Sequence, residues 1–435
     1  MQRQKIAIIG SGISGLTSAW FLRHDHDVTL YEADSRLGGH TNTVDIEYLG
    51  RKYAVDTGFI VCNDHTYPNF LRLMAELGVK TQPAPMGFSV IVDSCNLEYS
   101  SRVPGGLLAQ PSNMLKPSFI GMVRDILRFM REAPKDALKD ASPSLGEYLT
   151  RNRYGKAFTE HYLLPIGSAI WSSPIDTLNE FPLKQFVHFF NNHGLLDLKQ
   201  RVKWRTVVGG SQRYIDRLSD QLAPLIRLST PVLNVRRING KVQLDTADGE
   251  ESFDQVAFAC HSDQALRLIS DPSPAEQEVL GAIPFGINQA TLHTDASVLP
   301  KRRAAWSSWN YHVGAGGQPA ALSYHMNALQ GLDAPVEFCV SLNQNDRIDP
   351  HAILYKTDYS HPVYTLDSVA ARHRWSEISG VDRLHFCGAY WEHGFHEDGV
   401  RSGLRVASSI DGRKHLSGYL LPEDQHLSMI TDSTR

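Results

Sequence analysis

The feature that most limits the possible folds is a glycine-rich turn near the start of the chain, Gly10-Ser11-Gly12-Ile13-Ser14-Gly15. The apolar run Lys5–Ile9 before it is typical of a buried parallel strand, and from Ile13 apolar residues recur at helical spacing. Val28–Tyr31 then predicts a second strand. A strand, a helix and a strand in this order predict a parallel sheet covered by helices.

The spacing of these glycines is typical of a dinucleotide site. The first permits a tight turn, the second lets the backbone approach a pyrophosphate, and the third lets the helix pack on the strand. Such a pattern alone is also seen in ordinary turns. Here Glu32 ends the second strand, 22 residues after Gly10, where its carboxylate could bind both hydroxyls of an adenosine ribose. Together these residues predict dinucleotide binding.

A second glycine pair separates FAD from NAD. Arg36-Leu37-Gly38-Gly39 offers another close backbone approach and an arginine for phosphate. The order of the first glycine turn, Glu32 and this pair resembles the opening of the FAD-dependent amine oxidase and phytoene desaturase superfamily. Asp56-Thr57-Gly58 resembles the segment that passes beneath the flavin in that superfamily, and Gly209-Gly210 matches further along.

The end of the chain carries the last match. Phe386-Cys387-Gly388, then residues 394–400 and Ser402-Gly403, resemble the closing FAD motif of the superfamily, in which a helix N-terminus faces the flavin. No cysteine lies between Gly388 and Gly399, so the resemblance implies non-covalent FAD. It implies cofactor contacts at Gly10, Gly12, Ile13, Ser14, Gly15, Glu32, Ala33, Arg36, Gly38, Gly39, His40, Thr57, Gly58, Val235, Gly388, Gly399 and Val400.

The fold class follows from the order of the segments. Three β runs, Val232–Ile238, Lys241–Thr246 and Phe253–Ala259, are separated by Asn-Gly and Asp-Gly turns and predict an antiparallel meander. We expect an α/β chain with an α+β second lobe, a Rossmann-like FAD domain and an amine-oxidase-like two-domain architecture. The expected parts are an FAD domain of residues 1–75, 205–285 and 376–420, a substrate lobe of 76–204 and 286–375, and a polar tail of 421–435.

Composition excludes several classes of protein. The 43 Lys+Arg against 47 Asp+Glu give no basic excess for nucleic acid. Five scattered cysteines without a CxxC pair indicate neither a disulfide framework nor a zinc site, and they fit a reducing cytoplasm. No apolar stretch reaches 18 residues, and we see no secretory leader. His393 and His396 form an HxxH pattern, but the sequence offers no further ligands, so we expect no metal.

Departures from the superfamily bear on the substrate. Ala389 stands where many members place an acidic residue that binds the ribityl chain, so that contact must come from elsewhere. Phe395 matches one position of the aromatic cage of amine oxidases, and Tyr390 or Trp391 could supply the second ring. Trp309 and Asn310 are further candidates for lining the pocket, with core packing as the alternative. No catalytic acid or base is identified, because the flavin itself carries the chemistry.

Three functions stay open. The first is an FAD oxidoreductase that desaturates or isomerises a long apolar substrate, such as an unsaturated or methylated fatty acyl chain. Trp309-Asn310-Tyr311 and Met326-Asn327 resemble a bacterial subgroup often encoded beside cyclopropane-fatty-acid-synthase-like enzymes. The second is an amine oxidase that releases hydrogen peroxide, and the third a non-catalytic flavin-binding protein.

The apolar stripe of residues 119–130 predicts an amphipathic helix, which could either pack on its own lobe or touch the inner face of a membrane. We therefore expect a cytoplasmic enzyme with a small-molecule or lipid substrate and possible peripheral membrane contact; its oligomeric state is open.

Overall fold

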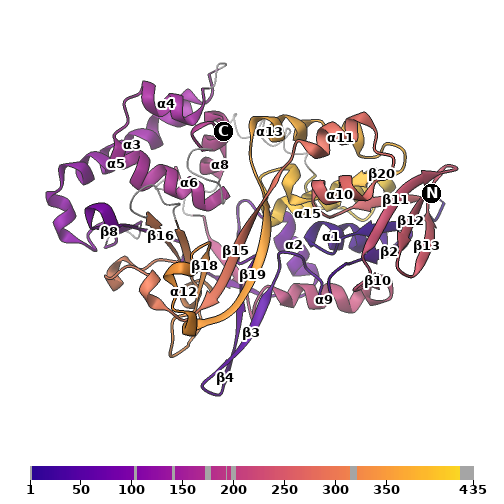
Figure 1. The fold of residues 1–435 in the computed structure, drawn as a ribbon, viewed down its shortest axis with the longest axis horizontal. Coiled ribbons are helices and arrows are strands. Elements are labelled where there is room, and N and C mark those ends of the chain that lie inside the picture. The colour runs from indigo at the N-terminus through magenta and orange to yellow at the C-terminus, as the bar shows by residue number, and fades with distance from the viewer. Residues whose placement is uncertain are drawn as a thin grey trace.

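The computed structural model describes residues 2–101, 105–139, 143–171, 178–192, 194–196, 202–313 and 321–421. Figure 1 shows a lobe of sheet and helices near the N-terminus beside a second lobe whose upper part is helical. The expected polar tail lies outside the described residues apart from Leu421.

The first lobe is built on a five-stranded parallel sheet. Ile6, Ala7 and Ile8 are fully buried, because both faces of this sheet are covered. The carboxyl ends of the strands therefore meet at one edge, where the glycine turn lies. In spatial order the strands are β10 (Ile226–Arg227), β2 (Asp27–Tyr31), β1 (Lys5–Ile9), β14 (Gln255–Phe258) and β20 (Leu384–Phe386).

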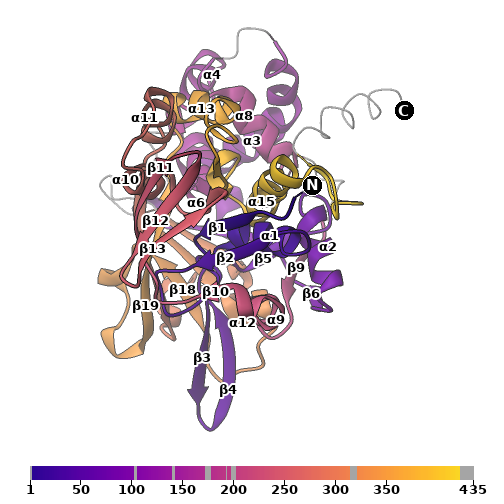
Figure 2. The ribbon, with the colours of Figure 1, turned by 90° about the vertical axis from the view of Figure 1, so that its right-hand side faces the viewer.

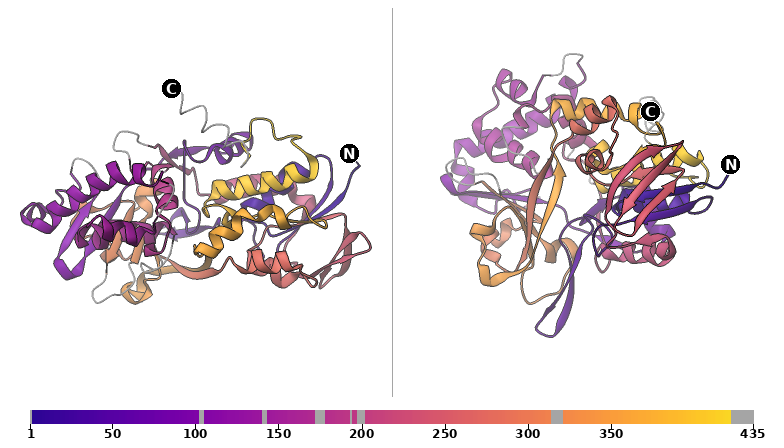
Figure 3. Two further views of the ribbon diagram at one scale, coloured as in Figure 1. Left: turned by 90° about the horizontal axis from the view of Figure 1, so that it is seen from above. Right: turned by 45° about the vertical axis from the view of Figure 1, so that its right-hand side comes forward.

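Helices and a small antiparallel sheet cover the two faces, as Figure 2 and Figure 3 show. The helices on one side are α1 (Ile13–Leu22), α2 (Pro68–Glu76), α9 (Gln212–Leu222) and α15 (His396–Asp411). On the other side lie β11 (Val232–Ile238), β12 (Lys241–Thr246) and β13 (Gly249–Phe253), with α10 (Ser262–Leu268), α11 (Pro274–Gly281), α13 (Leu366–His373) and α14 (Trp375–Ile378) nearby.

Two predicted elements have different bounds in the structure. The run Phe253–Ala259 is not the third strand of the meander, because the chain turns at Asp254 and Gln255–Phe258 joins the main sheet parallel to β1. The Asp254 carboxylate fixes this turn by accepting from the Lys5 N–H at 2.8 Å and from Lys241 Nζ at 2.7 Å. Apolar spacing near the end of the sequence predicts a last helix over Gly403–Ile410, but the helix begins at His396, because Asp398 accepts from the Phe395 N–H at 2.9 Å and caps the first turn.

The second lobe contains a seven-stranded sheet in which only β16 and β7 pair in parallel. Residues from distant parts of the sequence lie side by side in it, and the two longest strands run between the lobes in Figure 1. In spatial order the strands are β19 (Ile353–Pro362), β15 (Phe285–His293), β18 (Cys339–Leu342), β17 (Ala321–His325), β16 (Trp309–Val313), β7 (Phe88–Val92) and β8 (Leu97–Ser100).

The helices over this sheet are α3 (Pro117–Asp136), α4 (Leu145–Arg151), α5 (Lys156–Phe158), α6 (Leu164–Trp171) and α8 (Leu183–Asn192). In α3, Phe119, Met122 and Phe129 are buried in the core of this lobe. The amphipathic stripe therefore packs inward, although Ile120 and Leu127 are each about half exposed. Among the described helices, none combines the length and the apolar character that crossing a bilayer requires.

The remaining elements are short. A hairpin of β3 (Thr43–Tyr48) and β4 (Arg51–Asp56) projects at the bottom of Figure 1. The others are β5 (Val61–Asn63), β6 (Thr81–Pro83), β9 (Trp204–Val207) and α12 (Met326–Gln330). One hydrophobic core lies in the parallel-sheet lobe and another under α3 to α8, and we keep the domain boundaries predicted from the sequence as a proposal.

Candidate functional site

A cavity of about 840 Å³ runs from the glycine turn into the second lobe. Most of the cofactor contacts expected from the sequence line it. These are Gly10, Gly12, Ile13, Ser14, Glu32, Ala33, Arg36, Gly38, Gly39, His40, Thr57, Gly58 and Gly388. The residues therefore come together from the ends of β1, β2, β4 and β20, which lie far apart in the sequence.

The glycine turn has the form that an anionic ligand requires. Gly10 has φ of +107°, and a Cβ there would lie 2.9 Å from the Ala259 carbonyl oxygen. A Cβ at Gly12 would meet nothing within 4 Å, so this residue leaves open space beside the cavity. No side chain caps α1, so its first-turn N–H groups are available to phosphate oxygens. The turn thus fits the diphosphate of a dinucleotide.

Other glycines of the motifs allow neighbouring elements to pack closely. A Cβ at Gly15 would lie 2.0 Å from the Gly10 carbonyl oxygen, and one at Gly399 would lie 2.5 Å from Ile13 Cγ2. A Cβ at Gly403 would lie 2.4 Å from the Ser14 carbonyl oxygen. Gly15, Gly399 and Val400 are not among the cavity-lining residues. Gly15 allows α1 to pack against the sheet, and Gly399 allows α15 to pack against α1.

Glu32 holds the glycine turn through its side chain. Its Oε2 accepts from the Ser11 N–H at 2.9 Å and from Ser11 Oγ at 2.5 Å, while its Oε1 accepts from the Asp34 N–H at 2.9 Å. A carboxylate has about four acceptor sites, so capacity is left for a ligand hydroxyl. The sequence did not single out Ser11 beyond its place in the motif.

The second glycine pair lies directly over the first turn. The Gly38 N–H donates to the Ser11 carbonyl at 3.1 Å, and a Cβ at Gly39 would lie 3.2 Å from Gly12 Cα. The Arg36 guanidinium is engaged with backbone, since it donates to the carbonyl oxygens of Thr41 at 2.9 Å and Gly39 at 2.8 Å. Arg36 thus shapes this turn as well as lining the cavity.

The structure does not bring Val235 to the cavity lining, so its predicted cofactor contact stays a prediction. Val235 is fully buried, pairs with Leu244 in the meander, and is not a cavity-lining residue. Val232, three residues earlier, does line the cavity together with Thr230 and Pro231. The Thr230 N–H donates to the Glu32 carbonyl at 2.8 Å, which places this segment beside the ribose position.

The pocket candidates divide into two groups. Phe395, Tyr390 and Trp309 line the cavity. Trp391 is buried outside the lining, and so is Asn310. The Asn310 amide is used within the lobe, because it accepts from Ser89 Oγ at 2.7 Å and donates to the Ser307 carbonyl at 2.6 Å. Trp391 and Asn310 thus lie behind the lining of the cavity, and their predicted role in a substrate pocket stays a prediction.

Buried titratable groups surround the cavity. Burial lowers the pKa of His396 to about 3 and is the main cause that lowers the pKa of His393 to about 4. His396 lies against Phe59 with ring centroids 3.7 Å apart, and its Nε2 is 2.6 Å from the Tyr214 hydroxyl. Burial also raises the pKa of Glu397 to about 8, although this carboxylate accepts from the N–H groups of Asn69 and Phe70.

Sequence reasoning missed several lining residues. His261 ends the segment after β14, His361 lies on β19, and Tyr364 follows that strand. His396 lies inside the C-terminal motif, where its position could have marked it. The others stand in no local motif, so only the folded chain identifies them.

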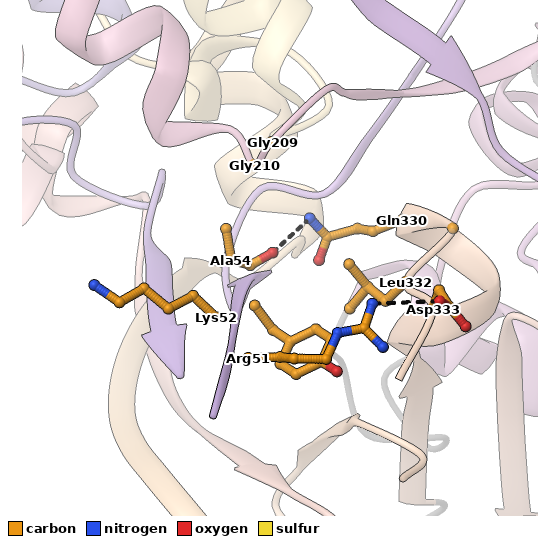
Figure 4. A pocket seen from close by; sticks show the side chains of 10 residues that line it. Arg51, Lys52, Ala54, Gly209, Gly210, Gln330, Leu332 and Asp333 are labelled. Carbon is orange, nitrogen blue, oxygen red and sulfur yellow. Dashed lines mark hydrogen bonds and ion pairs between the residues drawn. The ribbon is translucent and has the colours of Figure 1, made fainter. Parts of the chain in front are cut away.

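A second, smaller pocket of about 340 Å³ lies at the base of the hairpin (Figure 4). Arg51 and Asp333 form an ion pair at 3.3 Å across it. Gln330 Nε2 donates to the Ala54 carbonyl, as Figure 4 shows. The same nitrogen donates to Asp56 Oδ2 at 3.1 Å. Because these polar groups bind one another, the large cavity is the better candidate for a ligand.

Comparisons with known proteins agree with this geometry. A family model for flavin-containing amine oxidoreductases matches residues 13–316. Carotenoid phi-ring synthase of Chlorobaculum tepidum is 31% identical over 134 residues, and the match covers 30% of this chain and 20% of that protein. L-amino-acid oxidase of Bungarus fasciatus is 21% identical and covers 93% of this chain and 86% of that protein.

Solved structures share the two-domain α/β architecture predicted from the sequence, which is thereby confirmed. Cyclohexylamine oxidase from Brevibacterium oxydans has a TM-score of 0.68 at 15% identity, over 94% of this chain and 98% of that one. A fatty acid isomerase from P. acnes that produces CLA has a TM-score of 0.65 at 16% identity, over 95% and 99%. At such identities the likeness shows the fold alone.

The site, the family match and the fold identify the same cofactor. The cavity-lining cysteine Cys260 is not a reactive thiolate that could attach a flavin, because burial raises the pKa of its thiol to about 12 and keeps it protonated at neutral pH. The predictions of FAD and of its non-covalent binding are confirmed. The chain belongs to the flavin-containing amine oxidoreductase family and is an FAD-dependent oxidoreductase.

Proposed function

We propose that this enzyme removes hydride from a C–H bond of a long apolar substrate, such as an unsaturated or methylated fatty acyl chain. When bound, FAD supplies the hydride acceptor. Hydride removal beside a double bond, followed by loss of a proton, is a desaturation, whereas return of the hydride to another carbon is a double-bond isomerisation. The family assignment sets aside a non-catalytic flavin-binding protein.

The observation that carries this proposal is the chemistry of the cavity wall away from the glycine turn. This end is lined by apolar and aromatic side chains contributed mainly by the second lobe. They are Ile60, Val61, Ile170, Trp204, Trp309, Tyr324, Leu329, Leu342, Tyr364 and Phe395. Such a lining removes apolar surface of a substrate from water at roughly 25 cal/mol per Å².

Charge at this end is low in the described part of the chain. The charged residues that line the cavity are Glu32, Asp34, Arg36, Arg267 and Asp358. The first four belong to the glycine-turn side, and Asp358 accepts from Gln289 Nε2 at 3.0 Å. His393 lies at the apolar end with its pKa lowered to about 4, so it is neutral at neutral pH. This wall favours an uncharged chain over a cationic or anionic group.

The residues of this wall orient the substrate and exclude water. Phe395 stacks on Phe189 of α8 with ring centroids 5.1 Å apart and an interplanar angle of 22°, which ties the flavin-side turn to the second lobe. Trp309 lies edge-on to Tyr324 at 5.4 Å. Rigid aromatic walls of this kind hold a reacting carbon in position and keep the site dry. The P. acnes fatty acid isomerase supports the proposal through the fold it shares.

The alternative is an amine oxidase, which the family model and the cyclohexylamine oxidase fold favour. Phe395, which by the resemblance matches one position of an aromatic cage, lines the cavity. Its stacking on Phe189 engages one side of that ring.

Anaerobic flavin reduction separates the two activities. The holoenzyme is mixed with methylated or unsaturated fatty acyl lipids, with saturated unbranched lipids of the same length as the matched control, and with a panel of polyamines and aromatic amines. We expect the methylated or unsaturated lipids to bleach the flavin band, or to return as isomers detected by mass spectrometry. Rapid bleaching and hydrogen peroxide release with amines, and no change with lipids, would refute the proposal and support amine oxidation.

A further inference from the structure

The glycine-turn end of the cavity contains histidines where a diphosphate needs positive charge. His40, His261 and His361 line the cavity, and the His40 ring centroid lies 5.8 Å from that of His261 and 5.3 Å from that of His361. His40 directly follows Gly39, whose Cβ position lies 3.2 Å from Gly12 Cα. The His40 backbone is thus fixed beside the turn that fits the diphosphate.

Permanent cations at this end are already engaged. In the described lining, the guanidinium side chains are those of Arg36 and Arg267. Arg36 donates to the carbonyl oxygens of Gly39 and Thr41, and Arg267 forms an ion pair with Asp263 at 2.7 Å. The N-terminus of α1 supplies only a partial positive charge, so an imidazolium would complement a dianionic diphosphate.

Hydrogen bonds decide which imidazole can take a proton. The Gln289 N–H donates to Asn343 Oδ1 at 2.8 Å, so Asn343 Nδ2 donates to Asn288 Oδ1 at 2.8 Å. This leaves Asn288 Nδ2 to donate to His361 Nδ1 at 2.9 Å. His361 Nδ1 is therefore an acceptor, and this ring is held neutral.

His40 is arranged in the opposite way. Its Nε2 lies 3.2 Å from the Ser360 carbonyl oxygen, which can only accept, so Nε2 carries the hydrogen. No hydrogen bond to its Nδ1 is made within the described part of the chain. We propose that His40 binds the FAD diphosphate as an imidazolium, so that flavin binding takes up a proton at His40 Nδ1.

The direction of the pH effect follows from the surroundings of His40. Burial, and then the neighbouring His361, His261 and His396, hold the pKa of His40 well below its usual range, so it is neutral at neutral pH without ligand. A bound anion favours the imidazolium and raises this pKa. The Tyr359 ring stacks on His40, and its hydroxyl forms hydrogen bonds with Thr57 and Asn42. The charged residues in the described lining are Glu32, Asp34, Arg36, Arg267 and Asp358.

Linkage converts the proton uptake into a measurable slope. Between the pKa values of His40 in the free and bound states, the dissociation constant for FAD rises by up to about tenfold per pH unit for one proton. Above the pKa of the bound state this slope disappears, and FAD is held more weakly. The inference concerns cofactor retention and does not depend on the substrate.

The test measures FAD released from diluted holoenzyme at equilibrium, by the fluorescence of free flavin, from roughly pH 5.5 to 8.5, the range in which histidine titrates. Wild type should release more FAD as the pH rises. His40→Arg should abolish the slope and hold FAD more tightly than wild type at the alkaline end. His40→Gln should also abolish the slope, with weaker retention at the acidic end.

His351→Gln, at an exposed histidine that does not line the cavity, is the control and should retain the wild-type slope. A wild-type dissociation constant independent of pH would overturn the proposal even if no His40 variant folded. So would a His40→Arg enzyme that keeps the wild-type slope, because another group would then take up the proton.

Discussion

The two ends of the cavity are built from different kinds of contact. At the glycine-turn end, residues close together in the sequence, such as Gly10 and Gly12, shape the site through their backbone. At the apolar end, side chains such as Ile170, Trp309 and Leu342 come from α6, β16 and β18. The first end is encoded in short motifs shared across a family, whereas the second is assembled by the fold and can vary with the substrate.

The largest effects are expected within the glycine turn, from two valines three residues apart. Gly15→Val should prevent folding, at a cost above about 4 kcal/mol, because its Cβ would lie 2.0 Å from the Gly10 carbonyl oxygen and 3.0 Å from Ala259 Cβ. Gly12→Val should fold but contain no flavin, since the side chain would extend into open space at the cavity. Thermal unfolding and flavin absorbance report the two effects. A yellow Gly12→Val protein with full FAD content would contradict this assignment.

The comparison also explains which parts of the molecule could be predicted from the sequence. The strand Lys5–Ile9 and the start of α1 at Ile13 were predicted, because a continuous apolar run, glycines and apolar residues at helical spacing are local signals. The meander strands Val232–Ile238 and Lys241–Thr246 were also predicted, from an Asn-Gly turn between them.

The sequence is least informative where the outcome depends on distant contacts. Phe253–Ala259 reads as one β run, but Asp254 turns the chain through bonds to Lys5 and Lys241. Val235 and Val232 are both apolar positions of one strand, and only the fold shows that Val232 lines the cavity. Asn310 could not be separated from a ligand-facing residue until Ser89 and Ser307 were placed beside it.

Glu32→Ala should weaken FAD binding by about 1.5–3 kcal/mol, or roughly 10- to 150-fold in the dissociation constant. The carboxylate both fixes Ser11 and offers acceptor capacity to the ribose hydroxyls, so its loss disturbs the turn and removes a contact. Fluorescence of released FAD measures the change. Glu47→Ala, at an exposed site on β3, is the control and should bind FAD as wild type does. Equal affinities for Glu32→Ala and wild type would remove Glu32 from the site.

A change at the apolar end should separate reduction from retention. Leu342→Asn keeps nearly the same size but places an amide in the apolar wall, and we expect flavin reduction by the apolar substrate to slow roughly tenfold. FAD content should be unchanged, because Leu342 pairs with Ala290 and Leu322 in the sheet of the second lobe and belongs to none of the FAD-binding motifs. Leu366→Asn, at a residue that is 62% exposed, is the control and should reduce at the wild-type rate. Loss of FAD from Leu342→Asn would mean that the two ends are not separable.

The smallest expected effect tests where the ends meet, at Tyr390. Tyr390 lines the cavity after Gly388 and Ala389, and its buried hydroxyl lies beside the Trp391 side chain without a hydrogen bond of good geometry among the described residues. Because Ala389 cannot bind the ribityl chain, we expect the Tyr390 hydroxyl to do so. Tyr390→Phe should then weaken FAD retention by about 0.5–1.5 kcal/mol, the net value of one hydrogen bond.

The sign of the Tyr390 effect differs between the two forms of the protein, and this makes the prediction specific. Without flavin, Tyr390→Phe removes a buried polar group that makes no hydrogen bond of good geometry among the described residues, so the flavin-free protein should unfold at the same temperature as wild type or a higher one. With flavin, the same substitution should lower the unfolding temperature, because a contact present only in the holoenzyme is lost. Lower stability in both forms would show that the hydroxyl supports the fold and not the cofactor.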